Sequence, residues 1–426
     1  MLDLDPPAWL DDIEPPGSLS DYGLPDNVVP FRSDEPAGGM SGERPECTIR
    51  PSAFVWRDPA TITPRQWIYG HHLIRKYVAA TIAPGGVGKS TLTIGDAVAM
   101  ASGKALLGLR PHGPLRVWLW NGEDPREEIE RRVVAACLHH GIEPSEIAGR
   151  LFLDSGRDVP IRIGETGANG PKVAMPVIDV LIDAIRERRI DVLIIDPFVS
   201  VHSMPENDNG AMDAAVKAFA LVADRTGCAI DLVHHSRKLN GADADIDAAR
   251  GGSAIAGAVR SARALNVMSA EAAKAFAIAE SDRRAFVRID DAKANLAPSS
   301  AAKWFKLASE PLGNATADRP EDFVAVAEPW TPPDAMADIT VAHLLAVQKA
   351  IHKQALRESP QANSWVGHEI GRVLGLNSYG DPDKQKIKNA LRAWIASGAL
   401  IVERVVDDRG HKRPVVEVGE WATSPP

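Results

Sequence analysis

The stretch TIAPGGVGKSTL, residues 81–92, connects an apolar run to a helical pattern through a loop rich in glycine. Its Gly88-Lys89-Ser90 matches the end of the phosphate-binding P-loop pattern, which is Gly, four residues, then Gly-Lys-Ser/Thr. The first Gly of that pattern would be residue 83, where this chain has Ala83. Because Ala83 ends the predicted strand and needs only backbone angles that a small residue adopts, its methyl group is compatible with the loop.

A loop of this kind supplies what a nucleotide requires, although a Gly-rich turn that binds nothing is the alternative. The glycines let consecutive backbone N–H groups face a phosphate chain. Lys89 would lie beside the β and γ phosphates, and Ser90 would ligate Mg²⁺ at the positive end of the helix. The chain has no Asn-Lys-X-Asp guanine motif, which favours ATP. The predicted nucleotide-binding residues are Gly85, Gly86, Val87, Gly88, Lys89, Ser90 and Thr91.

Short apolar runs alternate with helical stretches from about residue 65 to residue 300. Near-continuous apolar runs are typical of strands in a parallel sheet that helices cover on both faces. We therefore predict an α/β fold with a mainly parallel sheet, in a P-loop ATPase domain of residues 51–309. The predicted strands are residues 77–83, 116–122, 150–154, 190–196, 228–235, 263–270 and 285–293.

The regions on either side of the predicted sheet differ from it in composition. Residues 1–50 hold 11 Asp or Glu, 3 Lys or Arg and 8 prolines, which predicts a disordered acidic leader and accounts for most of the net charge of −9. Residues 310–338 are rich in Pro, Ala and Asp and are predicted to be a linker. The 3 cysteines lack metal-ligand spacing, and no membrane span or secretory signal is evident, which favours a cytoplasmic protein.

Residues 339–426 are predicted to form a small winged-helix domain. Two amphipathic helices, 365–376 and 383–398, precede two strands around a polar turn within 400–418. The second helix carries a basic stripe that would enter the major groove of duplex DNA. A solvated face used for subunit or partner contacts is the alternative. The stripe consists of Lys384, Lys388 and Arg392.

The strand IDVLIID, residues 190–196, ends in Asp196. A carboxylate at the tip of such a strand is in the Walker B position, where it holds Mg²⁺ through water. Asp196 lies 107 residues after Lys89, on a strand predicted for the same sheet. Ser90 and Asp196 are therefore the predicted magnesium ligands.

The base that activates the attacking water has to lie elsewhere than directly after Asp196, because that position is Pro197. The run RVWLWNGED, residues 116–124, places Glu123 at the tip of the strand after the first helix. We predict that this strand neighbours the P-loop strand, so that Glu123 polarises water in line with the γ phosphate. Asp124 is the less favoured alternative, and capping of the next helix by the pair is compatible with either role.

The strand DLVHH, residues 231–235, ends in His234 and His235, directly before a loop that contains Gly and Arg. A polar side chain at this strand tip is placed to sense the γ phosphate and to signal to a substrate loop. The sequence leaves open which histidine is the sensor.

These elements together resemble the RepA group of hexameric RecA-like helicases of plasmids and phages, with Ala83 and the histidine pair as departures. The resemblance implies a ring-shaped ATPase with active sites between subunits, where a neighbour's arginine stabilises the transition state. By position that residue is Arg260, with Arg263 and Arg250 as alternatives, and Lys293 lies where the family has a basic residue near the subunit boundary. The matching stretches are APGGVGKS, WNGEDP, VLIIDPF, HHSRK, RGGSAIAGAVR and DAKANLAP.

The resemblance also implies that DNA-contacting loops follow the Walker B strand and the sensor strand. These are residues 201–213, which contain no Lys or Arg, and residues 236–252. Neither is the strongly basic channel that single strands favour. The predicted single-strand contacts are Arg237, Lys238 and Arg250.

Three functions are compatible with the sequence. The first is an ATP-hydrolysing motor on DNA, a homo-oligomeric ring of replicative helicase type from a plasmid, phage or integrated element. The second is a DNA-binding ATPase switch that regulates assembly or a partner without unwinding. The third, a recombination filament protein, is disfavoured by the weakly basic loops. The predicted catalytic residues are Lys89, Glu123, Arg260 and His235.

Overall fold

The computed structural model divides into two compact units, Met1–Thr63 and Pro64–Pro426, each taken by itself below. In the first unit, the described residues 51–63 hold the 3-10 helix η3 (Pro59–Thr61). The second unit contains a large sheet before residue 334 and a small helical part after residue 337. The structure describes residues 51–167, 170–236, 243–244, 252–276, 278–296, 302–333, 338–406 and 412–422.

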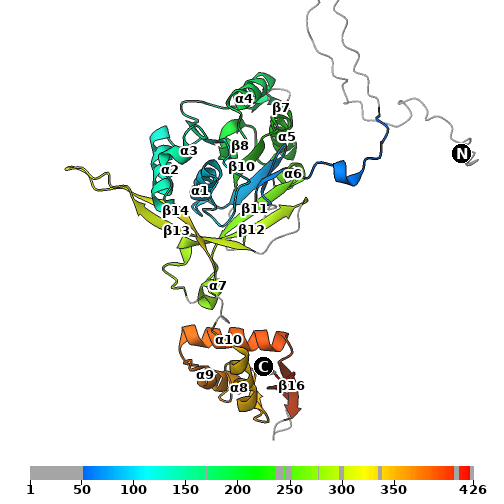
Figure 1. Cartoon of the computed structure of the whole chain (residues 1–426), viewed down its shortest axis with the longest axis vertical. Coiled ribbons are helices and arrows are strands. Elements are labelled where there is room, and N and C mark those ends of the chain that lie inside the picture. The colour runs from blue at the N-terminus through cyan, green and yellow to red at the C-terminus, as the bar shows by residue number, and fades with distance from the viewer. Residues whose placement is uncertain are drawn as a thin grey trace, which may run out of the picture. The chain divides into compact units, whose positions relative to one another are not determined.

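The large sheet has nine strands in the order β14-β13-β12-β11-β3-β10-β8-β4-β5 (Figure 1). Six neighbouring strands are parallel, and the three strands at one side pair antiparallel. This arrangement confirms the predicted α/β fold with a mainly parallel sheet. The parallel strands are β11 (Ser261–Val267), β3 (Val78–Ala83), β10 (Ala229–His235), β8 (Val192–Asp196), β4 (Val117–Asn121) and β5 (Leu151–Ser155). The antiparallel strands are β12 (Phe286–Ala294), β13 (Lys303–Pro311) and β14 (Phe323–Trp330).

Helices cover both faces of the parallel strands because successive strand side chains point to opposite faces. Ile194 packs in the core beneath α1 (Lys89–Ser102) and α2 (Arg126–His140). The next residue, Ile195, packs in the opposite core. The helices on that face are α4 (Met175–Arg188), α5 (Asn209–Thr226) and α6 (Gly252–Ala258).

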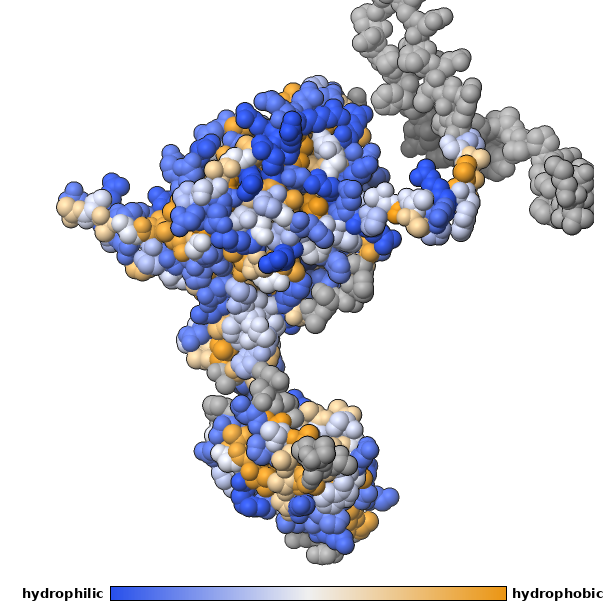
Figure 2. Space-filling view, viewed as in Figure 1, coloured by the Kyte–Doolittle hydropathy of each residue, from blue (hydrophilic) through white to orange (hydrophobic). Residues whose placement is uncertain are grey.

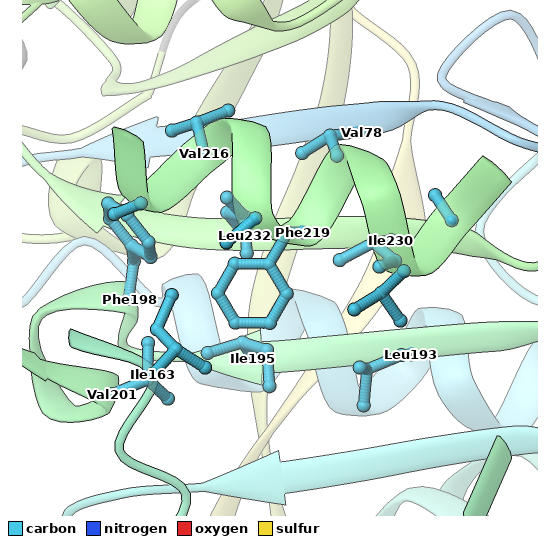
Figure 3. Close-up of a cluster of buried hydrophobic side chains, with 14 of the residues drawn as sticks. Val78, Ile163, Leu193, Ile195, Phe198, Val201, Val216, Phe219, Ile230 and Leu232 are labelled. Atoms are coloured by element: carbon cyan, nitrogen blue, oxygen red, sulfur yellow. The ribbon is translucent and has the colours of Figure 1, made fainter. Parts of the chain in front are cut away.

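The second core is built around Phe219 of α5, which is fully buried over the sheet (Figure 3). Ile195 and Leu232, which are paired on neighbouring strands, lie on two sides of the ring, and Phe198 lies beside it with the two ring centroids 6.2 Å apart. Hydrophilic residues dominate the visible surface of the part that holds the sheet (Figure 2). Among the described helices, none combines the length and apolarity that a membrane span requires.

Shorter elements connect the main ones. A second small sheet joins β6 (Gly164–Gly167), β7 (Gly170–Val173) and β9 (His202–Ser203), and β1 (Trp67–Tyr69) pairs with β2 (Leu73–Ile74). The remaining short helices are α3 (Pro144–Ile147), η4 (Phe198–Val201), α7 (Ala270–Ala275) and η5 (Arg283–Ala285).

The prediction of a linker over residues 310–338 is wrong where the chain forms strands, at residues 310–311 and 323–330. β13 continues to Pro311, and β14 forms the edge of the nine-stranded sheet. Val324 and Val326 are buried against the core under α1 and α2. The proline content misled the prediction because an edge strand tolerates a residue such as Pro329, which has no N–H to donate.

The part after residue 337 has its own core, in which Trp365, Ile387 and Trp394 are buried together. Its elements follow the order helix, strand, two helices, two strands, with the sheet order β15-β17-β16. The turn between the last two strands lies outside the described residues. The elements are α8 (Val341–Ile351), β15 (Leu356–Arg357), α9 (Val366–Leu374), α10 (Asp381–Ala396), β16 (Leu400–Val406) and β17 (Lys412–Val418).

Candidate nucleotide site

The P-loop follows β3, the fully buried strand between β11 and β10, and leads into α1. Gly86 and Gly88 have φ of +76° and +93°, a conformation that residues with a Cβ rarely adopt. A Cβ at Gly88 would lie 3.1 Å from a methyl group of Leu307 on β13. Ala83 ends β3 without a positive φ, so the glycine missing there is not required.

Lys89 is the first residue of α1, and its side chain bends back over the loop. Its Nζ donates to the carbonyl oxygens of Ala83 and Pro84, at 3.3 and 3.0 Å, and lies 3.1 Å from Nδ1 of His235. Burial lowers the pKa of Lys89, and the nearby carboxylates of Asp196 and Glu123 oppose that shift. The buried ammonium is therefore a cation held in a low-dielectric site.

Asp196 ends β8 and is 4% exposed. Burial raises the pKa of Asp196 to about 6, against the hydrogen bond from Ser90 and the charge of Lys89, which both lower it. The structure therefore brings the two predicted magnesium ligands into direct contact. β10 lies between β3 and β8, so the P-loop strand and the Asp196 strand are not adjacent.

The predicted neighbourhood of Glu123 is wrong in one respect. β4 pairs with β8 and β5, so two strands separate it from the P-loop strand. Glu123 nevertheless lies close enough to Lys89 and Asp196 to influence the pKa of both, because parallel strands end at one edge of the sheet.

Residues around Glu123 fix the path of its backbone. Oδ1 of the buried Asn121 accepts hydrogen bonds from the N–H groups of Glu123 and Asp124, at 3.0 and 2.8 Å. The guanidinium of Arg157 donates to the Glu123 carbonyl oxygen. The N–H of Gly122 donates to the Asp196 carbonyl oxygen at 2.9 Å, which ties the Glu123 loop directly to the end of β8. The side chain of Glu123 is left exposed, where it can reach water.

A cavity of about 480 Å³ opens at the P-loop. One wall comes from α2 and another from the start of β14, and neither was predicted to belong to the site. The α2 wall could have been suspected from the sequence, because the charged residues of that helix are spaced three and four apart and share one face. Gly85 and Val87 do not line the cavity, and Val87 is buried in the core behind it. The lining residues are Gly86, Gly88, Lys89, Ser90, Thr91, Glu128, Arg131, Arg132, Asp196, His235, Asp322, Phe323, Val324 and Ala325.

The two histidines at the end of β10 lie in different surroundings. His235 lines the cavity and lies beside Lys89. His234 is 1% exposed and packs against Phe198, with ring centroids 5.8 Å apart. Only His235 is therefore placed to meet a ligand in the cavity.

Arg260 lies at the opposite edge of the sheet from the P-loop of its own chain. Its N–H donates to the carbonyl oxygen of Val78, at the start of β3, whereas the P-loop follows Ala83 at the end of that strand. The strand between them spans about 20 Å. Arg260 and Lys293 both donate to carbonyl oxygens near the end of α6, and burial together with Arg260 lowers the pKa of Lys293.

Arg263, an alternative to Arg260, is excluded by burial. It is 5% exposed, and its Nη2 lies 2.7 Å from Asp96 and 3.4 Å from Asp231, while its Nε donates to Thr81. A buried guanidinium paired in this way cannot reach a neighbouring subunit. The other alternative, Arg250, lies outside the described residues.

Of the predicted single-strand contacts, Arg237, Lys238 and Arg250 all lie outside the described residues. The other predicted loop, 201–213, is not one loop, because it contains β9 and the first turn of α5. On α10, Lys384 lies over the ring of Trp365, with Nζ 5.8 Å from the ring centroid, and Arg392 is exposed.

The donor set suits a magnesium ion that arrives with a nucleotide. Within the described ranges, no cluster of three His, Cys, Asp or Glu side chains could hold a metal ion by itself. Mg²⁺ is usually bound by one or two carboxylates together with water and substrate phosphates. The buried Asp196 carboxylate and the Ser90 hydroxyl, side by side at the P-loop, fit that requirement.

Residues 43–241, somewhat less than half of the chain, match a protein family described as an AAA domain. The solved structures similar to the chain include a crystal structure of the RadB recombinase. That similarity has a TM-score of 0.37 and 10% identity and covers 55% of this chain and 88% of that chain, which is too slight to carry an argument. The family match and the P-loop geometry together support a P-loop ATPase.

Proposed function

We propose that the chain hydrolyses ATP and uses the reaction to move on DNA as a helicase-type motor. The observation that carries the proposal is that Lys89 and Asp196 line one cavity beside the P-loop, while the loop of Glu123 is hydrogen-bonded to the end of the Asp196 strand through Gly122. Glu123 does not line that cavity, but it lies close enough to influence the pKa of both residues. Binding alone requires a P-loop and a magnesium ligand. A further carboxylate beside them, exposed to water, serves hydrolysis.

In the proposed reaction, Glu123 accepts a proton from water while the water oxygen bonds to the γ phosphorus. The bond from that phosphorus to the β–γ bridging oxygen breaks, and its electron pair stays on ADP. Lys89 exchanges its carbonyl partners for the β and γ phosphate oxygens, and His235 senses the γ phosphate. Mg²⁺, held by Ser90 and Asp196, would neutralise charge on the phosphates.

Arg260 would complete the site of a neighbouring subunit. Its place at the far edge of the sheet from its own P-loop prevents it from acting within one chain. A neighbour that presents this edge to the cavity would supply a cation for the transition state. Repetition of that heterologous contact generates a ring, which is the assembly we propose.

The part after residue 337 is proposed to be a winged-helix domain that contacts duplex DNA. Its element order and three-stranded sheet support this assignment, with α10 as the helix for the major groove. Lys384, Lys388 and Arg392 would meet phosphates or bases. Single-strand binding by Arg237, Lys238 and Arg250 is part of the proposal and rests on the sequence alone.

The test is hydrolysis with and without single-stranded DNA, together with strand displacement from a forked duplex. Lys89→Ala should abolish hydrolysis, whereas Lys104→Ala, beyond the end of the same helix, should leave it unchanged. Glu123→Gln should retain ATP binding and hydrolyse ATP roughly 10²- to 10⁴-fold more slowly.

Normal hydrolysis by Lys89→Ala would refute the assignment of the site. Hydrolysis without stimulation by single strands and without unwinding would favour the second candidate, a DNA-binding ATPase switch. The observation that supports this second candidate is that the predicted single-strand loops are only weakly basic.

A further inference from the structure

Two arginines of α2 line the nucleotide cavity, and the proposed reaction has not yet used either of them. Arg131 and Arg132 both line it, but of the two Arg132 pairs with Asp124 on the Glu123 loop, which is hydrogen-bonded to the end of β8 through Gly122 and Asp196. Arg131 instead pairs with Glu128 and with Asp322 of the β14 wall, the latter at 3.1 Å. Arg132 is therefore the arginine held beside the Glu123 loop.

Two carboxylates hold the guanidinium of Arg132 in a defined orientation. Its Nη1 lies 2.9 Å from Asp124, and its Nε donates to Glu128, also at 2.9 Å. Within the part of the chain that the structure describes, these contacts leave its Nη2 without a hydrogen-bond partner. A planar guanidinium anchored on one side presents its free N–H groups in a fixed direction, as phosphate recognition requires.

The charges around the cavity show why another cation is useful. Among the described lining residues, Lys89, Arg131 and Arg132 are opposed by Glu128, Asp196 and Asp322. A triphosphate adds several negative charges to this balanced set. Arg260 of the same chain lies about 20 Å away along β3, so it cannot neutralise them from within.

We propose that Arg132 is a catalytic arginine supplied by the chain itself, whose Nη2 donates to the γ phosphate of bound ATP. This proposal rests on the proposed ATP hydrolysis and adds a residue to it. As the bond to the bridging oxygen breaks, Arg132 stabilises the charge that develops on the γ phosphoryl oxygens and on the leaving ADP oxygen. It moves no proton, since guanidinium remains protonated throughout.

The first experiment measures kcat, KM and the affinity for ADP of Arg132→Ala and Arg132→Gln in the full-length protein. We expect kcat to fall roughly 10²- to 10³-fold, as for the loss of one preorganised donor, while the Kd for ADP changes less than about fivefold. Trapping of ADP with aluminium fluoride, which mimics the transferred phosphoryl group, should be lost. Arg126→Ala, an exposed arginine at the start of α2 that pairs with Glu130, is the matched control and should leave all three unchanged.

The second experiment separates an arginine that acts within its own chain from one that acts on a neighbour. Arg132→Ala subunits mixed with Glu123→Gln subunits should recover no hydrolysis, because every site lacks one of the two groups. Arg260→Ala mixed with Glu123→Gln should recover part of it, because the site with an intact Glu123 receives an arginine from its neighbour.

Either of two results would overturn the proposal: normal kcat and normal fluoroaluminate trapping in both Arg132 variants, or recovery of hydrolysis on mixing Arg132→Ala with Glu123→Gln. A wild-type protein without Lys89-dependent hydrolysis would instead refute the proposed function itself. Wild-type hydrolysis with unaffected Arg132 variants would refute only this inference.

Discussion

At the scale of single residues, the chemistry of the site depends on how deeply each charge is buried. Lys89 and Asp196 are almost fully removed from water, whereas Glu123 remains exposed. Burial disfavours the charged form of each, so the pKa of Lys89 is lowered and that of Asp196 is raised. The charged forms of both residues are therefore destabilised until a nucleotide and Mg²⁺ supply partners.

Asp196→Asn should stabilise the chain in the absence of nucleotide and Mg²⁺, although it should abolish hydrolysis. Burial raises the pKa of Asp196 from 3.8 to about 6, so the folded state is favoured while the carboxyl is protonated. As the pH rises through about 6, Asp196 ionises in the folded protein, and its buried charge lowers the free energy of unfolding by up to about 3 kcal/mol. The variant should therefore raise the free energy of unfolding by about 1–3 kcal/mol at pH 8 and by much less at pH 4.

The measurement is urea unfolding with a chelator present at both pH values. Asp183→Asn, at an exposed position of α4, is the control and should change the free energy of unfolding little at either pH. An equal gain at pH 4 and pH 8, or a loss at pH 8, would contradict the assigned pKa.

At the scale of elements, the antiparallel hairpin of β13 and β14 changes the boundary of the ATPase domain. Leu307 of β13 packs against Gly88 of the P-loop, and Phe323 begins the wall of the cavity. His139 of α2 lies 3.0 Å from Glu310 and 3.2 Å from Glu328, so it joins both strands to the helix. The hairpin is thus a structural part of the nucleotide site.

Truncation tests this boundary. A chain of residues 51–333 should fold and bind ATP, whereas a chain of residues 51–309 should bind ATP at least tenfold more weakly or unfold. The shorter chain lacks β14 and exposes the apolar surface that Val324 and Val326 cover. Fluorescent-nucleotide titration and thermal unfolding of both chains would show the difference. Equal affinity and equal Tm would restore the linker prediction.

At the scale of the whole molecule, the groups proposed to act on ATP lie at two opposite ends of the parallel strands, and an assembly would bring them together. The parallel strands carry the P-loop, Asp196 and Glu123 at one edge and Arg260 at the other. A site that uses both edges requires a second copy of the chain. The basic helix α10 belongs to the part after residue 337, which has its own core.

Replacing Lys388 and Arg392 together by Ala should weaken binding to duplex DNA roughly tenfold at 0.1 M salt. The slope of log K against log salt should also become less steep by about 1 to 2, because the variant neutralises fewer phosphates and therefore releases fewer counterions from the DNA. The double variant Lys349→Ala/Lys353→Ala removes the same charge from exposed positions at the end of α8 and serves as the control. Equal loss in both variants would show a general charge effect and contradict a specific role for α10.

The sequence identified the residues whose local pattern is sufficient: Gly86, Gly88 and Lys89 in a strand–turn–helix, and Asp196 at the tip of an apolar run. It also predicted the mainly parallel sheet, since strand and helix periodicities are local properties. It could not give the strand order, which depends on long-range pairing, and so it placed Glu123 beside the P-loop strand when two strands intervene.

Tertiary packing decided the rest. It buried Arg263 and His234, turned His235 and Arg132 to the cavity, and folded the supposed linker back as β14 over α1 and α2. Composition could not reveal that strand because burial by distant helices, and not local propensity, makes it stable at the edge of the sheet. The P-loop could therefore be recognised from a dozen residues, whereas the shape and charge of its cavity result from contacts between segments more than 200 residues apart.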